Sequence, residues 1–181
     1  LINGWEDEDS VHGLVKKGTP NLYSTFEKRW DSWHVGKQHF LTEEGQDQQT
    51  ASLTRWITQK DYSAWVKRRG AVKPGGQRFK ASVPEVVSAE RTHLRAYSIP
   101  VVELYEPGLD NFLDHYIANE SVAAIRNRNK SKPLLLNAMF LAPHPPFHIP
   151  DPYFSLFVNE RIALPENVAV WYPGQSPLQL Y

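Results

Sequence analysis

Two short motifs carry the side chains in this chain that are best suited to binding an anion. The first, Gly36-Lys37-Gln38-His39, places a lysine and a histidine two positions apart, so an extended backbone would present both on one side. The ammonium supplies a positive charge, and the imidazole can bond an oxyanion or carry a proton near neutral pH. Together they suit a tetrahedral anion such as sulfate or phosphate. Taken alone, the motif also fits an exposed lysine beside a histidine that is bonded within its loop.

The second motif is Pro143-His144-Pro145-Pro146, which holds one histidine in a stiff proline cluster. It follows an apolar run, 134–141, and prolines cannot continue a sheet, so we expect a strand to end here. In open α/β sheets, ligands bind at the carboxyl ends of the strands, where both motifs are expected to lie. One interpretation of His144 is therefore a functional side chain on a rigid turn. The other is a histidine that packs among the prolines and bonds a backbone carbonyl.

The elements around these motifs predict an α/β domain, a three-layer sandwich with a mostly parallel sheet. The run 134–141 is apolar at nearly every position, which is typical of a strand buried on both faces. Asp110 is the expected N-cap of the clearest helix. Apolar spacing predicts helices over 21–30 and 110–128. We also expect a helix over 52–66 and a strand over 32–35 that ends at Gly36.

The segment from about 43 to 100 is polar and irregular apart from its one helix, and we interpret it as a variable, loop-rich insert. Within it, residues 67–80 contain six basic residues and no acidic ones, together with a Pro-Gly-Gly turn. We favour a solvated surface loop, because charge runs usually face solvent. The alternative is a binding surface for a sulfated polysaccharide, with tryptophans stacked on sugar rings, although aromatic residues at helical spacing more often pack in a core. These tryptophans are Trp30, Trp33, Trp56 and Trp65.

The composition of the 181 residues excludes several kinds of site. Lysine plus arginine and aspartate plus glutamate number 20 each, so the net charge indicates neither a nucleic-acid partner nor a membrane surface. There are no cysteines, which excludes disulfides, zinc-thiolate sites and thiol nucleophiles within this sequence. No apolar run approaches the roughly 20 residues of a membrane span. Four further histidines have no metal-binding spacing and are expected to be structural, namely His12, His34, His93 and His115.

In this order, and with a large variable insert between them, the two motifs resemble those of the sulfatase family. In that family a Gly-Lys-x-His segment is followed much later by an apolar strand and a Pro-His-x-Pro turn. The corresponding segments here are 33–40 (WHVGKQHF) and 140–147 (FLAPHPPF), and the likeness continues at 150–153 (PDPY) and 162–167 (IALPEN). The resemblance covers roughly residues 19–40 and 105–167.

The resemblance implies an alkaline-phosphatase-like fold and a sulfuric ester hydrolase that cleaves a small-molecule or carbohydrate sulfate ester. Such enzymes use a formylglycine nucleophile, and a calcium ion held by carboxylates polarises the sulfate oxygens. By position, Lys37 would neutralise charge on the sulfate and on the formylglycine oxygen. His39 would hydrogen-bond the formylglycine, and His144 would contact the sulfate near the leaving oxygen.

Two parts of the family pattern have no counterpart in this sequence. We find neither the Cys/Ser-x-Pro/Ala-x-Arg motif that is converted to formylglycine nor the acidic segments that bind calcium. We therefore expect residues 1–181 to be an internal part of one sulfatase catalytic domain, with the nucleophile and the calcium ligands outside this chain. Two alternatives remain open. One is a phosphatase or phosphonate hydrolase of the same superfamily, and the other is a non-catalytic module that binds sulfated polysaccharide.

We expect the isolated chain not to hydrolyse aryl sulfates, because it lacks the nucleophile and the calcium ligands. In a longer protein that supplies both, Lys37→Ala or His144→Ala should each raise the activation barrier by roughly 2–4 kcal/mol, the usual scale for removing one preorganised partner of an oxyanion. The measurement is steady-state hydrolysis of an aryl sulfate. Turnover by the isolated chain above that of its own Lys37→Ala variant would show this interpretation to be wrong.

Overall fold

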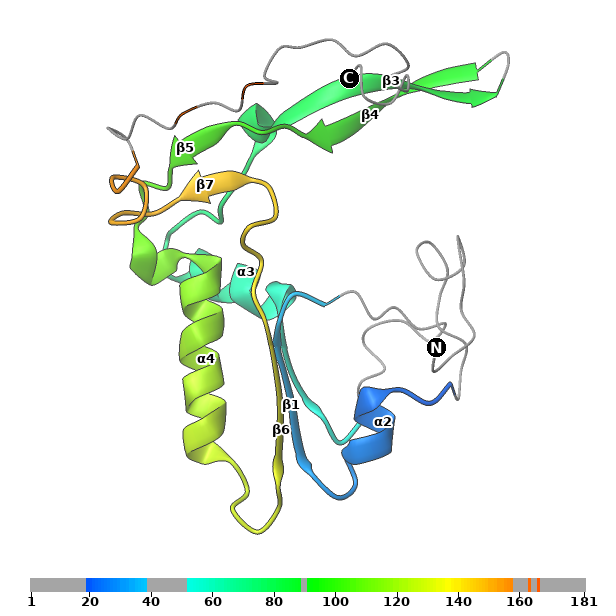
Figure 1. Ribbon diagram of the computed structural model, residues 1–181, viewed down its shortest axis with the longest axis vertical. Helices are drawn as coiled ribbons and strands as arrows, with labels where there is room; N and C mark the ends of the chain where they lie inside the picture. Colours follow the sequence, from blue (N-terminus) through cyan, green and yellow to red (C-terminus); the bar gives the residue numbers. More distant parts are fainter. Residues whose placement is uncertain (1–18, 39–51, 89–90, 158–162, 164–165, 167–181) are drawn as a thin grey trace.

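A three-stranded parallel sheet carries both motifs. The computed structural model describes residues 19–38, 52–88, 91–157, 163 and 166 (Figure 1). Its helices are α2 (Leu22–Phe26), α3 (Gln59–Arg68) and α4 (Leu113–Asn127), with short 3-10 turns η2 (Gln77–Phe79) and η3 (Leu109–Asn111). Its strands are β1 (Asp31–Gly36), β2 (Arg55–Thr58), β3 (Lys80–Ser88), β4 (Arg91–Ser98), β5 (Val102–Leu104), β6 (Leu134–Met139) and β7 (Phe147–Ile149). The sheet has the order β2-β1-β6, and both pairings are parallel.

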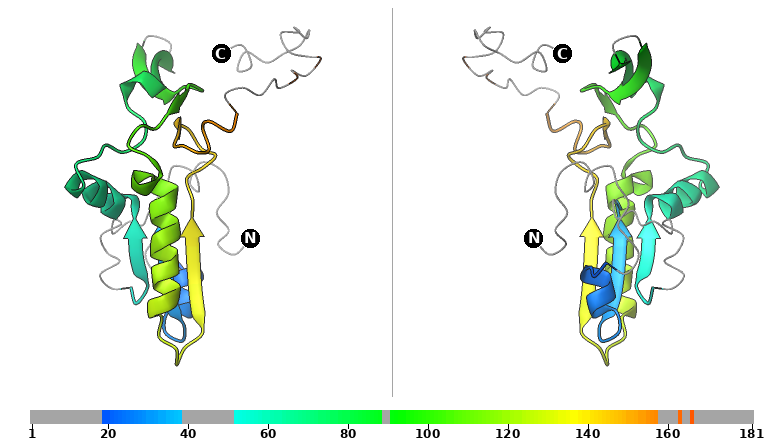
Figure 2. Two further views of the ribbon diagram at one scale, coloured as in Figure 1. Left: turned by 90° about the vertical axis from the view of Figure 1, so that its left-hand side faces the viewer. Right: turned by 90° about the vertical axis from the view of Figure 1, so that its right-hand side faces the viewer.

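Helices lie on both faces of this sheet, which gives the three-layer α/β arrangement expected from the sequence. Figure 2 shows α2 and α4 on opposite faces. On the α4 face, the fully buried Val35 of β1 meets side chains of α3 and α4, which are Tyr62, Val66, Leu113, Tyr116 and Ile117. A mixed α/β fold with a parallel sheet is therefore confirmed. The more specific alkaline-phosphatase-like fold stays a prediction.

The most buried strand of the sheet is β1 rather than β6. β1 lies between β2 and β6, and five of its six residues are buried. β6 covers 134–139 instead of 134–141, and its residues are half-buried or exposed. The expectation of a strand buried on both faces is therefore wrong for the described structure, because β6 forms one edge of the three described strands. Its apolar residues still reach the core, against which Leu136 packs.

Two of the expected helices have different boundaries in the structure. The helix expected over 21–30 is the shorter α2, which begins after Asn21 in a capping box. The segment 52–66 is not one helix but holds β2 followed directly by α3. The change from strand to helix occurs at Thr58, the last residue of β2, whose side chain caps the first turn of α3. Trp56 therefore lies in the strand β2 and Trp65 in the helix α3, so the two tryptophans do not belong to one helix.

α4 agrees closely with the helix expected over 110–128. It begins after η3, however, and Phe112 rather than Asp110 occupies the N-cap position. Four residues of the apolar stripe that predicted this helix are buried, among them the fully buried Ile117, whereas Ile125 at the end of the stripe is half exposed. The stripe is therefore what fixes α4 on the sheet.

The insert between the motifs contains a regular β-hairpin. β3 and β4 pair in antiparallel fashion, and every residue of β4 is exposed. Figure 1 shows this hairpin beyond the carboxyl ends of the central strands. The expectation of a loop-rich 43–100 segment with a single helix is therefore wrong for its described part. The hairpin was missed because its strands do not pack on the core, so they lack the alternation of apolar and polar residues that marks a half-buried strand.

The end of β1 approaches β6 so closely that residue 36 has to be a glycine. Gly36 has a φ of +113°, and a Cβ atom there would lie 2.1 Å from the carbonyl oxygen of Met139. The backbone N–H of Lys37 donates to this same carbonyl at 2.8 Å. The contact is between two backbones, so it cannot be relieved by a side-chain rotation. The glycine of the first motif therefore has a structural explanation in the pairing of β1 with β6.

Gly36→Ala should lower the free energy of unfolding by more than about 2 kcal/mol, because it combines an unfavourable φ with a backbone clash. Gly70→Ala is the matched control: Gly70 also has a positive φ, +70°, but a Cβ atom there would meet nothing within 4 Å. The control should cost only about 1 kcal/mol, the strain of a left-handed backbone alone. Urea denaturation of both variants measures the difference, and equal losses would contradict the close approach of the two strands.

Candidate functional site

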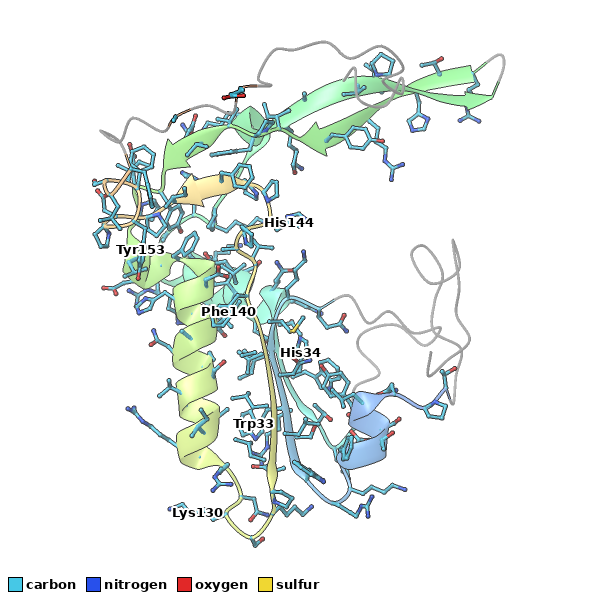
Figure 3. All side chains as sticks on the ribbon, viewed as in Figure 1. Trp33, His34, Lys130, Phe140, His144 and Tyr153 are labelled. Atoms are coloured by element: carbon cyan, nitrogen blue, oxygen red, sulfur yellow. The ribbon has the colours of Figure 1, made fainter. Side chains whose placement is uncertain are left out.

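The carboxyl ends of β1 and β6 bring the two motifs together. Lys37 directly follows β1, His144 lies in the turn after β6, and both line one cavity of about 400 Å³. Figure 3 shows His144 beyond the end of β6, whereas His34 lies within the sheet. His39, the third residue predicted for the site, lies outside the described residues. Two of the three predicted residues thus meet at the expected edge of the sheet.

His144 is oriented by its own turn. Its backbone N–H donates to the carbonyl of Leu141 at 2.9 Å, and its Nδ1 lies 2.6 Å from the carbonyl oxygen of Pro145. Because a carbonyl can only accept, Nδ1 carries a hydrogen, and the other ring nitrogen, Nε2, is the one that can exchange a proton with a ligand. The backbone bond expected of a structural histidine is present, and the same ring lies at the wall of a cavity. The two interpretations of His144 are therefore compatible.

The segment 69–76 between α3 and η2 is attached to the rest of the site at several points. The Tyr105 hydroxyl donates to the carbonyl of Val72. The backbone N–H of Gly75 donates to Nδ1 of His148 at 3.1 Å. A Cβ atom at Gly75 would also lie 3.0 Å from the proline ring at position 146, so the segment touches the turn of the second motif. Although most of its residues are exposed, the segment is not a freely solvated loop.

Lys73 lies in this segment and lines the same cavity as Lys37 and His144. The cavity thus has two ammonium groups and one imidazole on its wall, a set of donors that suits a tetrahedral oxyanion. In the sequence, Lys73 belongs to the basic run 67–80, which predicts a surface loop and does not mark this lysine as a site residue. The Pro-Gly-Gly turn within that run was the available signal, because such turns bring a chain close to its neighbours.

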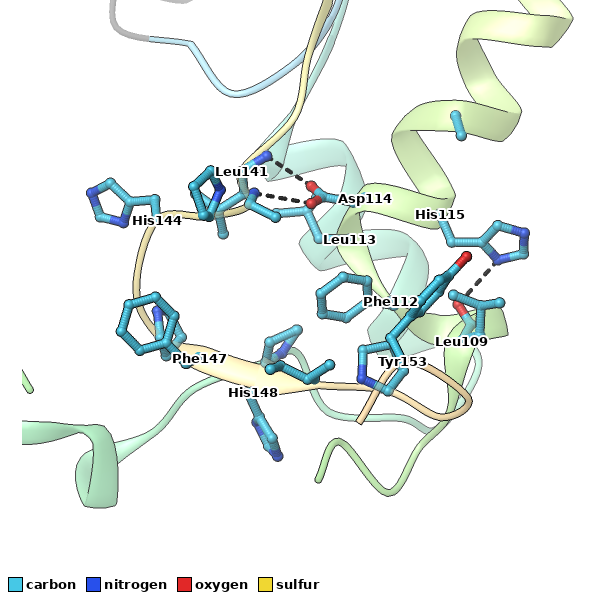
Figure 4. A pocket seen from close by; sticks show the side chains of 17 residues that line it. Leu109, Phe112, Leu113, Asp114, His115, Leu141, His144, Phe147, His148 and Tyr153 are labelled. Carbon is cyan, nitrogen blue, oxygen red and sulfur yellow. Dashed lines mark hydrogen bonds between the residues drawn. The ribbon is translucent and has the colours of Figure 1, made fainter. Parts of the chain in front are cut away.

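Asp114 holds the start of the second motif in place. It lies in the first turn of α4, and its carboxylate accepts hydrogen bonds from the backbone N–H groups of Leu141 at 2.7 Å and Ala142 at 2.9 Å (Figure 4). Two charge-assisted bonds to consecutive residues fix the direction in which the chain leaves β6. Asp114 was predicted only as part of a helix, and its position in the first turn was the signal that it could accept such bonds.

His34 supports Lys37 from within the sheet. Asn137 donates to the Tyr23 hydroxyl at 2.7 Å, so this hydroxyl donates in turn to Nδ1 of His34, 2.5 Å away. Nε2 of His34 then carries the hydrogen and donates to the backbone carbonyl of Lys37 at 3.1 Å. Burial lowers the pKa of His34 and outweighs its backbone hydrogen bonds, so the ring is neutral near pH 7. The structural role expected for this histidine agrees with its contacts.

His148 supports the segment that carries Lys73. It is buried between the rings of Phe79 and Tyr105, with ring centroids 4.8 and 5.0 Å away. Its Nδ1 accepts from Gly75, and its Nε2 lies 3.0 Å from the carbonyl oxygen of Leu104, to which it donates. Burial is the largest influence on the pKa of His148 and lowers it. This residue was not singled out in the sequence, where it follows the second motif without a recognisable pattern.

The described residues do not by themselves form a calcium site. Among them, no group of three or more histidine, cysteine, aspartate or glutamate side chains is placed to hold a metal ion. The calcium ion that the sulfatase resemblance implies therefore does not fit the described part of this chain.

None of the helices in the described part is long and apolar enough to cross a membrane.

Comparisons of the chain with models of protein families, with curated proteins and with solved structures found no match.

The two buried histidines should make the folded state sensitive to acid. The pKa values of His34 and His148 lie below the ordinary value. Once the pH falls below about 6.5, the unfolded chain therefore binds more protons than the folded one. The free energy of unfolding should be largest above this pH and should decrease as the pH falls through the two folded-state pKa values. Urea unfolding at a series of pH values from neutral to mildly acidic measures the decrease.

The control for this experiment is a His34→Gln and His148→Gln double variant. It will be less stable at neutral pH, but it lacks both groups and should therefore lose less of its remaining stability as the pH falls. The same pH dependence in both proteins would show that other groups cause the acid sensitivity.

Proposed function

We propose that the cavity lined by Lys37, Lys73 and His144 binds the sulfate group of an ester, and that the chain is part of a sulfuric ester hydrolase. The observation that carries the proposal is the meeting of Lys37 and His144 at one cavity, although their motifs lie far apart in the sequence. Lys73 adds a second positive charge from a third segment. A sulfate ester has one negative charge spread over three terminal oxygens, and several convergent donors can bond these oxygens at once.

Each residue would contribute a different part of the chemistry. The ammonium groups of Lys37 and Lys73 would orient the sulfate and offset negative charge on its terminal oxygens. During hydrolysis, the bond between sulfur and the ester oxygen breaks, and negative charge develops on that oxygen as it leaves. His144, protonated at Nε2, would donate a proton to it as a general acid. The attacking nucleophile is expected outside this chain, so only binding and proton transfer are assigned to these residues.

The packing of the tryptophans argues against the polysaccharide-binding alternative. Trp56 packs against Tyr23, with ring centroids 4.5 Å apart. Trp65 packs against Tyr116 at 4.9 Å and lies at the edge of the main core. Both side chains are half-buried in these contacts, which leaves less of each ring available to stack on a sugar. The phosphatase alternative is not affected by this argument, because phosphate and sulfate have the same tetrahedral shape.

Binding of inorganic sulfate to the 181-residue chain tests the proposal without requiring turnover. Lys37→Ala and Lys73→Ala should each weaken binding by roughly tenfold, which corresponds to the loss of one charge-assisted hydrogen bond. Titration calorimetry at constant ionic strength measures the dissociation constants.

Lys67→Ala is the matched control, because Lys67 is an exposed lysine in the last turn of α3 and does not line the cavity. A loss in this control as large as that in Lys37→Ala would indicate general charge attraction and would contradict the proposal. Tighter binding of inorganic phosphate than of sulfate, with the same dependence on Lys37, would favour the phosphatase alternative.

A further inference from the structure

A second cavity of about 620 Å³ lies beside the first. The two cavities have five lining residues in common, so they are separated by a single wall rather than by a layer of structure. These residues are Pro74, Leu113, Leu141, His144 and Pro146. His144, the residue assigned to the leaving oxygen, therefore lies at the boundary between the two. The group attached to that oxygen would extend into the second cavity.

The second cavity is lined mostly by apolar side chains. Figure 4 shows Phe112, Phe147 and Tyr153 around it, with Leu109 and Leu141 nearby. Its volume lies within the roughly 300–1,000 Å³ that is usual for small-molecule sites, and such sites are typically apolar with a few polar groups. A body with aromatic or branched alkyl groups would replace water along these walls and gain free energy by burial.

The polar side chains on these walls are largely committed to bonds within the protein. Both carboxylate oxygens of Asp114 accept backbone N–H groups, and both ring nitrogens of His148 are hydrogen-bonded. Nδ1 of His115 lies 3.0 Å from the carbonyl oxygen of Leu109. A sugar would bring several hydroxyl groups into the cavity and would lose their bonds to water without comparable replacements. These walls therefore disfavour a carbohydrate body.

We infer that the second cavity binds the apolar body of an ester whose anionic group occupies the Lys37 and Lys73 cavity. The inference rests on the proposed function for the identity of the anion. It selects aryl or branched-alkyl sulfate esters over carbohydrate sulfates as the substrate class. The polar group and the apolar body would be sorted into adjacent cavities, with the ester oxygen next to His144.

The test compares three probes, which are inorganic sulfate, 2-naphthyl sulfate and neutral 2-naphthol. Their dissociation constants are measured on the full 181-residue chain at one ionic strength. 2-Naphthyl sulfate should bind at least about tenfold more tightly than inorganic sulfate, because burial of its rings adds to the anion contacts. Ala118→Phe fills the second cavity from α4 and should abolish this advantage while it leaves the affinity for inorganic sulfate unchanged.

Val122→Phe is the matched control. It introduces the same phenyl ring one turn further along α4, at an exposed position that does not line the cavity. Tyr153→Ala is a second variant, which removes a partly exposed ring from the wall and carries little risk of unfolding. This variant should weaken the binding of 2-naphthyl sulfate but not that of inorganic sulfate. Equal affinity for 2-naphthyl sulfate and inorganic sulfate, or no effect of either cavity variant, would overturn the inference.

The neutral probe separates this inference from the proposed function. One outcome is that 2-naphthol binds and Ala118→Phe abolishes this binding, while the binding of neither sulfate probe is weakened by Lys37→Ala. The apolar site then stands and the sulfate assignment fails. If sulfate binding depends on Lys37, but neither naphthyl probe responds to Ala118→Phe, then the sulfate site stands and the apolar site is refuted.

Discussion

The parallel pairing of β1 with β6 is the constraint on which the site depends. In a parallel sheet, neighbouring strands end at the same edge, so the residues that follow them are brought together whatever their separation in the sequence. Here Gly36 allows the two backbones to approach to the point where the carbonyl of Met139 bonds the next residue, Lys37. A side chain at position 36 would force the strands apart. It would also move Lys37 away from the turn that holds His144.

Each candidate ligand-binding side chain is supported by a residue behind it that bonds the backbone. His34 bonds the carbonyl of Lys37, and Asp114 bonds the chain just before the turn of the second motif. His148 bonds the segment that carries Lys73. The supporting histidines are buried and neutral, whereas the lysines that they support line the cavity. Backbone support of this kind fixes where a side chain starts without consuming its own hydrogen-bonding groups.

The parts of this structure that could be predicted from the sequence are those with a local signal. α4 has apolar residues at helical spacing, the strand before the second motif is a continuous apolar run, and the two motifs lie where strands end. Lys73 and the β3–β4 hairpin carry no such signal. The position of Lys73 depends on contacts between segments that are distant in the sequence, such as the bond from Gly75 to His148. Likewise, the burial of β1 rather than β6 depends on strand order, which single-strand patterns do not encode.

The side chains at the cavity come from two parts of the structure that differ in how far they can change. Lys37 and His144 come from the ends of sheet strands, which cannot change without altering the core. Lys73 comes from a segment that is anchored only at a few points on the surface of that framework. Substitutions or changes of length in this segment could therefore add, remove or shift one positive charge at the cavity while the sheet stays intact. One sheet framework can in this way support different anion preferences, with the 69–76 segment as the adjustable part.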